Sequence, residues 1–470
     1  MFRPTPSPDA QSMTVTEAAL DTVETLRPGD EAYADAARVL FATGEPALVV
    51  RPGSAEEVAA ALAHAVTTGL PLSVRSGGHS LLGHGTNTGG LVIDLARLDG
   101  VEIVDPDRRR VRVGAGASWG QVAAALDPFG WCITAGDTAG VGVGGLTLGG
   151  GIGWLVRRDG LAIDNLVRAR VVTADGRLVT ASAQENPDLF WALRGGGGNF
   201  GVVVDFDFVA TTVGAVHFGW ITYRLDGDPE ATAATAGLLG RWRDAMRRAP
   251  DALASTMVLG PRVPDAAPSA TVLVCYAADP GASVEDADLA IEPLLELGTV
   301  AEAAISESRY AAILEEVDLP PGLRLVSRNT LLPVLGREAI AAIAAFHASS
   351  ASPAIAVRSL GGAFGRVPPH ATAFAHRDAE AMAVGMLMVP ESTPEATIAE
   401  SLLPWHAVAA RGEGTYLNFQ GSATDADLEA AYPAATLARL AQVKRTYDPT
   451  NVFALNHNIG PAGPGEGPAA

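Results

Sequence analysis

Nearly half of the glycines of this chain fall in four short windows. The windows 77–90, 114–120, 136–160 and 195–201 hold 24 of the 52 glycines within 53 residues. Glycine adopts positive φ angles and lets the backbone approach another group closely, and successive free N–H groups form a nest for anions. We therefore expect these loops to hold a large phosphate-bearing cofactor. The alternative is a set of tight turns between strands.

The near absence of lysine excludes two other ways of using a phosphate-bearing group. Lys444 is the only lysine among the 470 residues. It lies in Gln-Val-Lys-Arg, which does not match the Gly-Lys-Ser/Thr of a phosphate-binding loop. A pyridoxal enzyme would have to form its Schiff base on this same residue. A nest of backbone amides is therefore the expected way of binding a diphosphate.

The charge and hydropathy of the chain argue against two classes of partner. The net charge of −20 repels phosphate backbones, and no basic run interrupts it. The N-terminal segment has no apolar leader, and the uncharged stretch from Ala139 to Val156 contains eight glycines, which argues against a membrane span. We expect a soluble cytoplasmic protein that binds neither nucleic acid nor membrane.

The sequence contains no recognisable set of metal ligands. His79 and His84 are five residues apart in a glycine loop, and neither H-x-x-x-H nor C-x-x-C occurs. The two cysteines, Cys132 and Cys275, are too few for a disulfide framework and are expected to be partly buried thiols. We therefore predict no metal site.

Local signals predict many of the elements. Ser54 and Glu57 form a capping box for a helix that runs to Gly69. Hairpins are expected around Asp105-Pro106-Asp107 and Asp175-Gly176. Strands are predicted over 48–50, 72–75, 91–95, 200–208, 217–223, 270–276 and 416–419, and helices over 229–248 and 284–295. From about residue 213 to 414 this pattern predicts an antiparallel sheet covered by helices.

Two short motifs suggest other enzyme classes. G-x-G-x-x-G occurs at Gly140 and at Gly196, but neither copy follows a strand and opens a helix, as a Rossmann loop does. Gly116-Ala-Ser118-Trp-Gly120 matches the nucleophile elbow G-x-S-x-G, which leaves a serine hydrolase as a remote alternative. The better interpretation of Ser118 is a helix N-cap.

Several segments, taken together, resemble one flavoprotein superfamily. They are Arg75-Ser-Gly-Gly-His-Ser80 with Leu91 to Leu95, Gly136 to Trp154, Asp188 to Gly201, and Tyr416 to Phe419 with Asn451 to Ile459. Their order and types resemble the vanillyl-alcohol-oxidase and p-cresol-methylhydroxylase superfamily, and within it the bacterial berberine-bridge-enzyme-like oxidoreductases. The matches extend from about residue 40 to 460.

The resemblance implies an α+β flavoprotein of two domains. The FAD-binding domain, of the p-cresol-methylhydroxylase type, is expected to be discontinuous. It would combine residues 1–212 with residues 415–470, which include a flexible tail. Residues 213–414 would form the substrate-binding domain.

The resemblance also implies a single covalent link to FAD. His79 would be joined to the flavin 8α carbon, and the cysteine that forms a second link in many relatives is replaced by Thr138. Val141 lies where relatives control the access of oxygen, and its small side chain favours an oxidase. The residues expected to contact FAD are Arg75, Ser76, Gly77, Gly78, His79, Ser80, Gly136, Asp137, Thr138, Val141, Gly142, Gly145, Gly151, Val203 and Asn456.

The catalytic candidates are Tyr416 and Asn418. In alcohol-oxidising relatives the tyrosine of the Tyr-x-Asn-Tyr/Phe segment acts as the base, and a phenol does so only if its pKa is lowered, for instance by an arginine. The chain departs from relatives at Leu81, where many have a second tyrosine, and at Ala363 to Arg366, where some have a carboxylate.

We expect oxidation of a small molecule, an alcohol on a sugar or a secondary metabolite, with O2 reduced to H2O2. A flavin dehydrogenase that uses another acceptor is the alternative. The sequence leaves the substrate's identity and the oligomeric state open.

Overall fold

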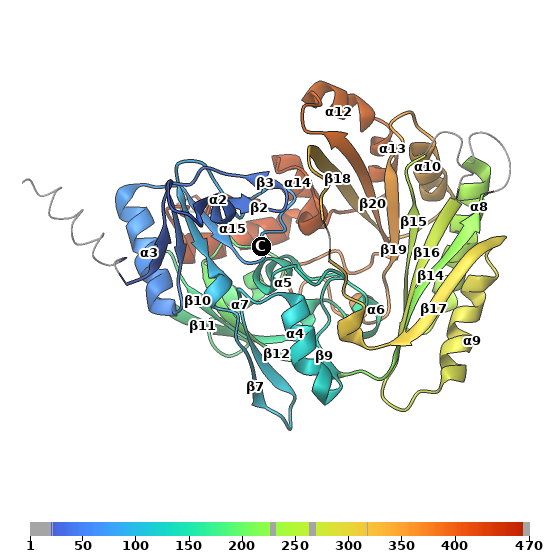
Figure 1. Cartoon of the computed structure of the whole chain (residues 1–470), viewed down its shortest axis with the longest axis horizontal. Coiled ribbons are helices and arrows are strands. Elements are labelled where there is room, and N and C mark those ends of the chain that lie inside the picture. The colour runs from blue at the N-terminus through green and yellow to red at the C-terminus, as the bar shows by residue number, and fades with distance from the viewer. Residues whose placement is uncertain (1–19, 21, 226–231, 263–268, 317, 464–470) are drawn as a thin grey trace, which may run out of the picture.

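Two assemblies of strands and helices lie side by side in the computed structural model, which describes residues 20, 22–225, 232–262, 269–316 and 318–463 (Figure 1). One contains the N-terminal strands together with the C-terminal helices. The other contains one large sheet. The predicted flexible tail includes residues 464–470, which lie outside the described residues. Within the described residues, no helix is both long and apolar enough to span a membrane.

The first assembly begins with a four-stranded sheet. Its order is β1 (Glu24–Leu26), β4 (Leu48–Arg51), β6 (Leu91–Asp94) and β5 (Leu72–Arg75), with β4 and β5 both parallel to β6. Helix α3 (Ala55–Thr68) connects β4 to β5. As predicted, Ser54 caps it by accepting a hydrogen bond from the Glu57 N–H at 3.2 Å, and Gly69 ends it with a φ of +68°.

A five-stranded antiparallel sheet follows. Its order is β11 (Leu178–Ser182), β10 (Leu166–Val172), β12 (Val202–Val209), β8 (Arg110–Gly114) and β7 (Val101–Asp105). Both predicted hairpins are confirmed, as β7–β8 and β10–β11. The central strand β12 is buried along nearly its whole length, and its sequence is apolar apart from Asp205 and Asp207, which pair with arginines of the neighbouring strands.

Helices from both ends of the chain share one core with these sheets. They are α4 (Trp119–Leu126), α5 (Val143–Gly149), α7 (Pro187–Leu193), α14 (Asp425–Ala431) and α15 (Ala434–Tyr447). Leu440 and Val443 of α15 pack in the same cluster as Val113 and Phe206. The C-terminal helices thus pack in the core of the N-terminal sheets, which supports a discontinuous domain. We propose that its limits lie near residues 212 and 414.

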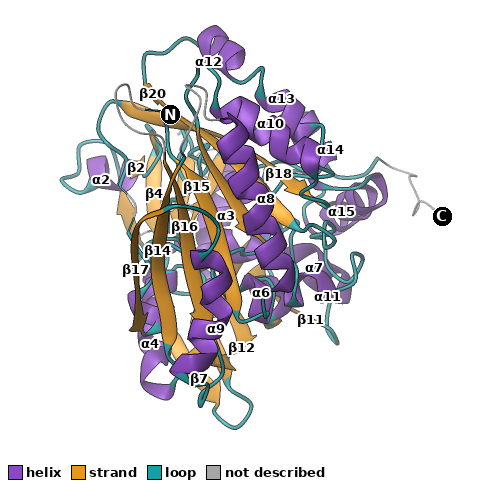
Figure 2. Cartoon of the chain, turned by 90° about the vertical axis from the view of Figure 1, so that its right-hand side faces the viewer, coloured by secondary structure: helices purple, strands orange, loops and turns teal. Residues whose placement is uncertain are grey.

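The second assembly is a seven-stranded antiparallel sheet. Its order is β17 (Val300–Ser308), β14 (Val216–Arg224), β16 (Ser269–Ala277), β15 (Leu253–Leu259), β19 (Ala354–Ser359), β20 (Ala381–Pro390) and β18 (Leu323–Leu332). Figure 2 shows helices in front of its outer face. They are α8 (Thr232–Arg248), α9 (Val284–Leu295), α10 (Arg337–His347) and α13 (Trp405–Ala409). The predicted helix-covered sheet is confirmed.

The remaining elements are short. They are α2 (Tyr33–Ala37), β2 (Arg38–Val39), β3 (Ala42–Thr43), β9 (Trp131–Cys132), α6 (Val156–Asp159), β13 (Thr211–Thr212), α11 (Ala363–Arg366) and α12 (Glu395–Ser401). The predicted helix over 229–248 is described from Thr232, and its first residues lie outside the described part of the chain.

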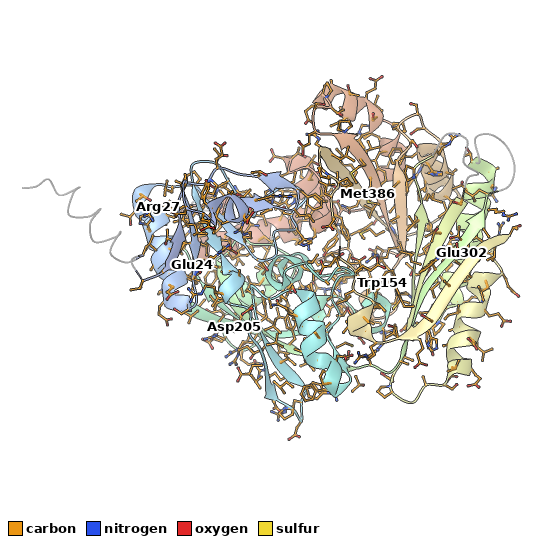
Figure 3. The ribbon with its side chains drawn as sticks, in the orientation of Figure 1. Glu24, Arg27, Trp154, Asp205, Glu302 and Met386 are labelled. Carbon is orange, nitrogen blue, oxygen red and sulfur yellow. The ribbon has the colours of Figure 1, made fainter. Side chains whose placement is uncertain are left out.

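The two faces of the large sheet pack against different parts of the molecule. Because side chains alternate along a strand, Ile355 and Val357 of β19 pack in the core beneath the helices, whereas Ala356 and Arg358 point to the first assembly. Trp154 and Met386, labelled in Figure 3, lie between the two assemblies. This inner face is where the sheet meets the glycine-rich loops.

One predicted strand is wrong. The segment from Tyr416 to Phe419 contains a 3₁₀ helix (Leu417–Phe419) in place of a strand. The Asn329 side chain of β18 accepts a hydrogen bond from the Tyr416 N–H at 2.7 Å and donates one to its carbonyl oxygen at 2.9 Å. The Asn329 side chain thus makes the two hydrogen bonds that a neighbouring strand would otherwise make to Tyr416. The backbone after Tyr416 can therefore turn into the 3₁₀ helix.

Candidate active site

The loop after β5 offers a run of unused backbone donors. In the described part of the chain, the amide N–H groups of Gly77, Gly78, His79 and Ser80 donate no hydrogen bond. Gly78 has a φ of +73°, which favours glycine. Such a run of free amides is the nest that the sequence predicted for a diphosphate.

A second glycine loop packs directly against this nest. A Cβ atom at Gly77 would lie 2.3 Å from the amide nitrogen of Gly142, and one at Gly142 would lie 2.1 Å from that of Gly77. Only glycine permits this approach. Ser76 fixes the contact, because its hydroxyl donates to the Ala115 carbonyl at 2.6 Å and accepts from the Gly144 N–H at 3.2 Å. The loops therefore hold each other at the start of α5.

Arg75 supports the nest from behind. Its buried guanidinium donates to Asp94 and to the carbonyl of Ala36, both at 2.6 Å, and to the carbonyl of Arg38 at 3.2 Å. These partners belong to the scaffold of the first sheet. The side chain of Arg75 is therefore engaged in positioning the loop.

His79 lies at the edge of the nest beside a carboxylate. Its imidazole and the carboxylate of Glu316 both approach Gly140, whose Cβ would lie 3.1 Å from His79 Nε2 and 2.8 Å from Glu316 Oε2. Burial lowers the pKa of His79, and the charge of Glu316 opposes that shift. The net direction is downward, which leaves the imidazole neutral and nucleophilic at pH 7.

Asp137 and Thr138 connect the loop to the large sheet. Arg358 of β19 forms an ion pair with Asp137, donates to the Ile152 carbonyl at 3.4 Å, and lies over the Trp154 ring at 5.5 Å. Burial raises the pKa of Asp137, but Arg358 outweighs it and holds that pKa below its usual value. Thr138 donates to Asp137 at 3.3 Å.

Tyr416 and Asn418 come together at the other end of α5. The Tyr416 hydroxyl accepts hydrogen bonds from the Gly151 N–H at 3.0 Å and from the Asn418 amide at 2.8 Å. Asn418 also donates to the Leu146 carbonyl at 3.2 Å. Burial raises the pKa of Tyr416 to about 12, although these donors and the charge of Arg358 oppose the shift. The expected lowering by an arginine is therefore outweighed by desolvation.

The C-terminal segment brings Asn456 to the fourth glycine window. Its amide donates to the carbonyls of Gly198 at 3.3 Å and Phe453 at 3.2 Å. Within the described residues, four buried acceptor-capable atoms of the segment Asn451 to Ile459 lack a partner, namely Asn451 Oδ1, Asn456 Oδ1, His457 Nδ1 and Asn458 Oδ1. Buried polar atoms without a partner are what a large polar cofactor would satisfy. These residues therefore fit FAD.

The other predicted contact residues surround α5. Gly136 and Val141 precede it, Gly145 lies within it, and Gly151 follows it. Val203 lies on β12, paired with Val171 of β10. A Cβ atom added at Gly145 would have no other atom within 4 Å, so the space beside this residue is open.

Neither cysteine is among the residues predicted to contact FAD. Cys132 and Cys275 are both buried, and Cys132 lies 3.4 Å from the Thr211 hydroxyl. Ser118 caps α4 in a capping box with Gln121, as predicted. Among the described residues, no group of three or more His, Cys, Asp or Glu side chains is arranged to hold a metal ion.

Sequence reasoning missed three residues of the site. Arg358 is the one charged residue in the apolar strand Ala354-Ile-Ala-Val-Arg358, and this irregularity was its only signal. Asn329 and Glu316 carry no motif at all. Each reaches the site from the large sheet or its connections, so only the tertiary structure reveals it.

Two family models match parts of the chain. The model described as "FAD binding domain" matches residues 46–182, and that described as "Berberine and berberine like" matches residues 415–460. The first range contains the nest and α5, and the second contains Tyr416, Asn418 and Asn456.

Relatives match over nearly the whole chain. (R)-6-hydroxynicotine oxidase from Paenarthrobacter nicotinovorans is 33% identical over 434 residues, with 89% of this chain and 92% of that protein covered. The crystal structure of 6-hydroxy-D-nicotine oxidase from Arthrobacter nicotinovorans has a TM-score of 0.83 at 29% identity, covering 94% of this chain and 98% of that one. Xylooligosaccharide oxidase from Myceliophthora thermophila also has a TM-score of 0.83, at 26% identity, covering 97% and 100%. With its nest, its α5 and its C-terminal segment matched in order, this chain belongs to the berberine-bridge-enzyme-like FAD-linked oxidoreductases of the vanillyl-alcohol-oxidase and p-cresol-methylhydroxylase superfamily.

Proposed function

We propose that this protein is an FAD-dependent oxidase with one covalent link, through His79, that oxidises a small organic substrate and reduces O2 to H2O2. The observation that carries the proposal is the arrangement about α5. The unused amides and His79 lie at its N-terminal end, and Tyr416 with Asn418 lies at its C-terminal end. Seven helical residues separate these ends by about 10 Å.

FAD, when bound, supplies the acceptor for a hydride and the route of electrons to oxygen. The free amides of Gly77 to Ser80 would bind its diphosphate, and Asn456 would meet its ring system. Thr138 stands where a second link would form, and a threonine cannot make that bond. One tether is therefore expected, with a lower flavin reduction potential than two would give.

Tyr416 would take the proton from the substrate hydroxyl. Two donors, the Gly151 N–H and the Asn418 amide, converge on its oxygen, and the charge of Arg358 acts in the same direction. Donors aimed at one oxygen stabilise the anion that forms on it. These donors and Arg358 offset only part of the cost of burying a phenolate, and the pKa of Tyr416 stays raised. The base would therefore act best at alkaline pH.

The inner face of the large sheet favours an apolar substrate. Phe218 and Leu273 pack there against the cluster of Trp154, and Ala356 and Met386 pack against that of Tyr416. A sugar would leave its hydroxyls facing these side chains without partners. Of the two classes expected from the sequence, we therefore propose an alcohol on a secondary metabolite. The relatives described above are named for 6-hydroxynicotine and for a xylooligosaccharide, so the family includes members named for a pyridine compound and for a sugar.

The test compares electron acceptors. Turnover of the holoenzyme in air should match or exceed turnover with an artificial acceptor under nitrogen, with one H2O2 formed per substrate oxidised. Turnover that needs the artificial acceptor would instead establish the flavin dehydrogenase. The remote hydrolase would be colourless and inhibited by serine-directed reagents. We do not favour it, because the Ser118 hydroxyl accepts the Gln121 N–H at 3.2 Å as a helix cap.

A further inference from the structure

The segment around Glu316 is fixed against the loop that carries Thr138. The Ala139 N–H donates to the Glu315 carbonyl at 2.8 Å, and the Glu315 N–H donates to the Asp137 carbonyl at 3.3 Å. Thr138 and Glu315 form an isolated parallel bridge. Glu316 follows directly, so its position relative to this loop is set by backbone hydrogen bonds.

The bare face of Gly140 lies between Glu316 and His79. A Cβ atom there would lie 2.8 Å from Glu316 Oε2 and 3.1 Å from His79 Nε2, with His79 Cε1 at 3.5 Å. The carboxylate oxygen and Nε2 are therefore at most about 6 Å apart. Nε2 is the imidazole atom nearest to this Cβ position, and Nδ1 is not among the three nearest atoms. The effect of Glu316 on the pKa of His79 agrees with this proximity.

We propose that Glu316 is the positioning residue for the attachment of FAD to His79. The inference rests on the proposed covalent link. The negative charge of Glu316 near Nε2 favours the tautomer that carries its proton on Nε2, in which the Nδ1 lone pair is free to attack. No other link is available at Thr138, so the attachment depends on this one imidazole.

The reaction balances with dioxygen as the oxidant. One C–H bond of the 8α methyl group breaks, and Nδ1 forms a bond to that carbon. The methyl proton, the imidazole proton and two electrons end on the flavin ring, which is thereby reduced. Dioxygen then reoxidises the ring and becomes H2O2. Glu316 stabilises the transient positive charge on the imidazole before its Nε2 proton leaves.

Three variants change this geometry in different ways. Glu316→Ala removes the carboxylate, Glu316→Gln keeps a polar side chain of similar size without the charge, and Gly140→Ala places a methyl group between the two side chains. Glu315→Gln is the matched control, because its backbone makes the bridge while its side chain is not invoked. The probe is FAD added to protein prepared with incomplete flavin loading.

The measurement is the rate at which flavin becomes covalently bound. It is followed as the flavin fluorescence that stays with the acid-precipitated protein and with the protein band in a denaturing gel. We expect attachment about tenfold slower in Glu316→Ala and Gly140→Ala, an intermediate rate in Glu316→Gln, and no change in Glu315→Gln. Total flavin bound before denaturation should be the same in all variants, which separates attachment from folding and binding.

Two outcomes would overturn the inference, and they are distinguishable. If Glu316→Ala attaches flavin as fast as the unmodified protein, Glu316 has no such role, while the proposed link through His79 stands. If the unmodified protein itself releases all its flavin in acid, the covalent link fails and this inference fails with it.

Discussion

The Nζ atom of Lys444 lies 2.6 Å from the Oδ2 atom of Asp448, and neither side chain is exposed to solvent. The same ammonium group donates to the carbonyls of Asn199 at 2.8 Å and Phe453 at 3.0 Å. Its three donors are thus all used. The only lysine of the chain therefore ties α15 to the fourth glycine window and to the segment that carries Asn456.

Replacing Lys444 by Met should destabilise the protein by about 3–5 kcal/mol, because Asp448 would be left as a buried charge without its partner. Urea unfolding followed by tryptophan fluorescence measures the change. Arg177→Met is the control, since its ion pair with Asp175 is exposed and worth at most about 1 kcal/mol. Equal losses in the two variants would contradict this account of Lys444.

The ion pair between Arg358 and Asp137 should also matter for stability. Arg358→Met leaves Asp137 without its cation and should cost about 3 kcal/mol at pH 7. The double variant Arg358→Met/Asp137→Asn removes both charges and should recover much of that loss. Thermal unfolding of the unmodified protein, the single variants Arg358→Met and Asp137→Asn, and the double variant gives the coupling. Additive losses would show that the two side chains do not stabilise each other.

The same pair predicts a pH dependence. The pKa of Asp137 is held below its usual value, so its contribution to stability is present above the unfolded-state pKa and is lost as pH falls through the folded-state pKa. In Arg358→Met the pKa of Asp137 rises. The loss of unfolding free energy in this variant, relative to the unmodified protein, should therefore shrink as the pH falls. A loss that stays constant from pH 7 to pH 4 would contradict the assignment.

The sequence predicts local elements well where the signal is local. The Ser54 cap, both hairpins and the helix Val284–Leu295 follow from neighbouring residues, and the structure contains all of them. The nest was predictable because its glycines are clustered. The strand at Tyr416 was wrongly predicted, because the backbone partner there is the side chain of Asn329. Arg358 and Glu316 were not predictable, since they reach the site only through tertiary packing.

Tyr416→Phe tests the proposed base. With its pKa raised to about 12, Tyr416 is ionised in only about one molecule in 10⁵ at pH 7, and that fraction rises tenfold per pH unit. The kcat/KM of the unmodified enzyme should therefore rise between pH 7 and pH 10. Tyr416→Phe should lower kcat by about 10²–10⁴-fold and abolish this rise.

The control for that variant is Tyr223→Phe, which removes a buried hydroxyl beneath the outer helices. It should change neither kcat nor the pH profile. If Tyr416→Phe keeps the slope of the unmodified enzyme, another group accepts the substrate proton.

Thr138→Cys should add a second link to the flavin. A thiol at this position stands where many relatives carry the second attachment, and two links should raise the reduction potential above that of the singly linked protein. Mass spectrometry of the flavin peptides and a redox titration measure both effects. Two separate peptides, with flavin on only one of them, would show that residue 138 does not reach the ring.

The absorption spectrum before and after acid precipitation tests the central claim most directly. We predict a yellow protein whose flavin absorbance stays with the precipitate, and a His79→Ala variant that binds FAD but releases it in acid. Release of all flavin from the unmodified protein would contradict the covalent link. A colourless protein that takes up no added FAD would contradict the account of the site as a whole.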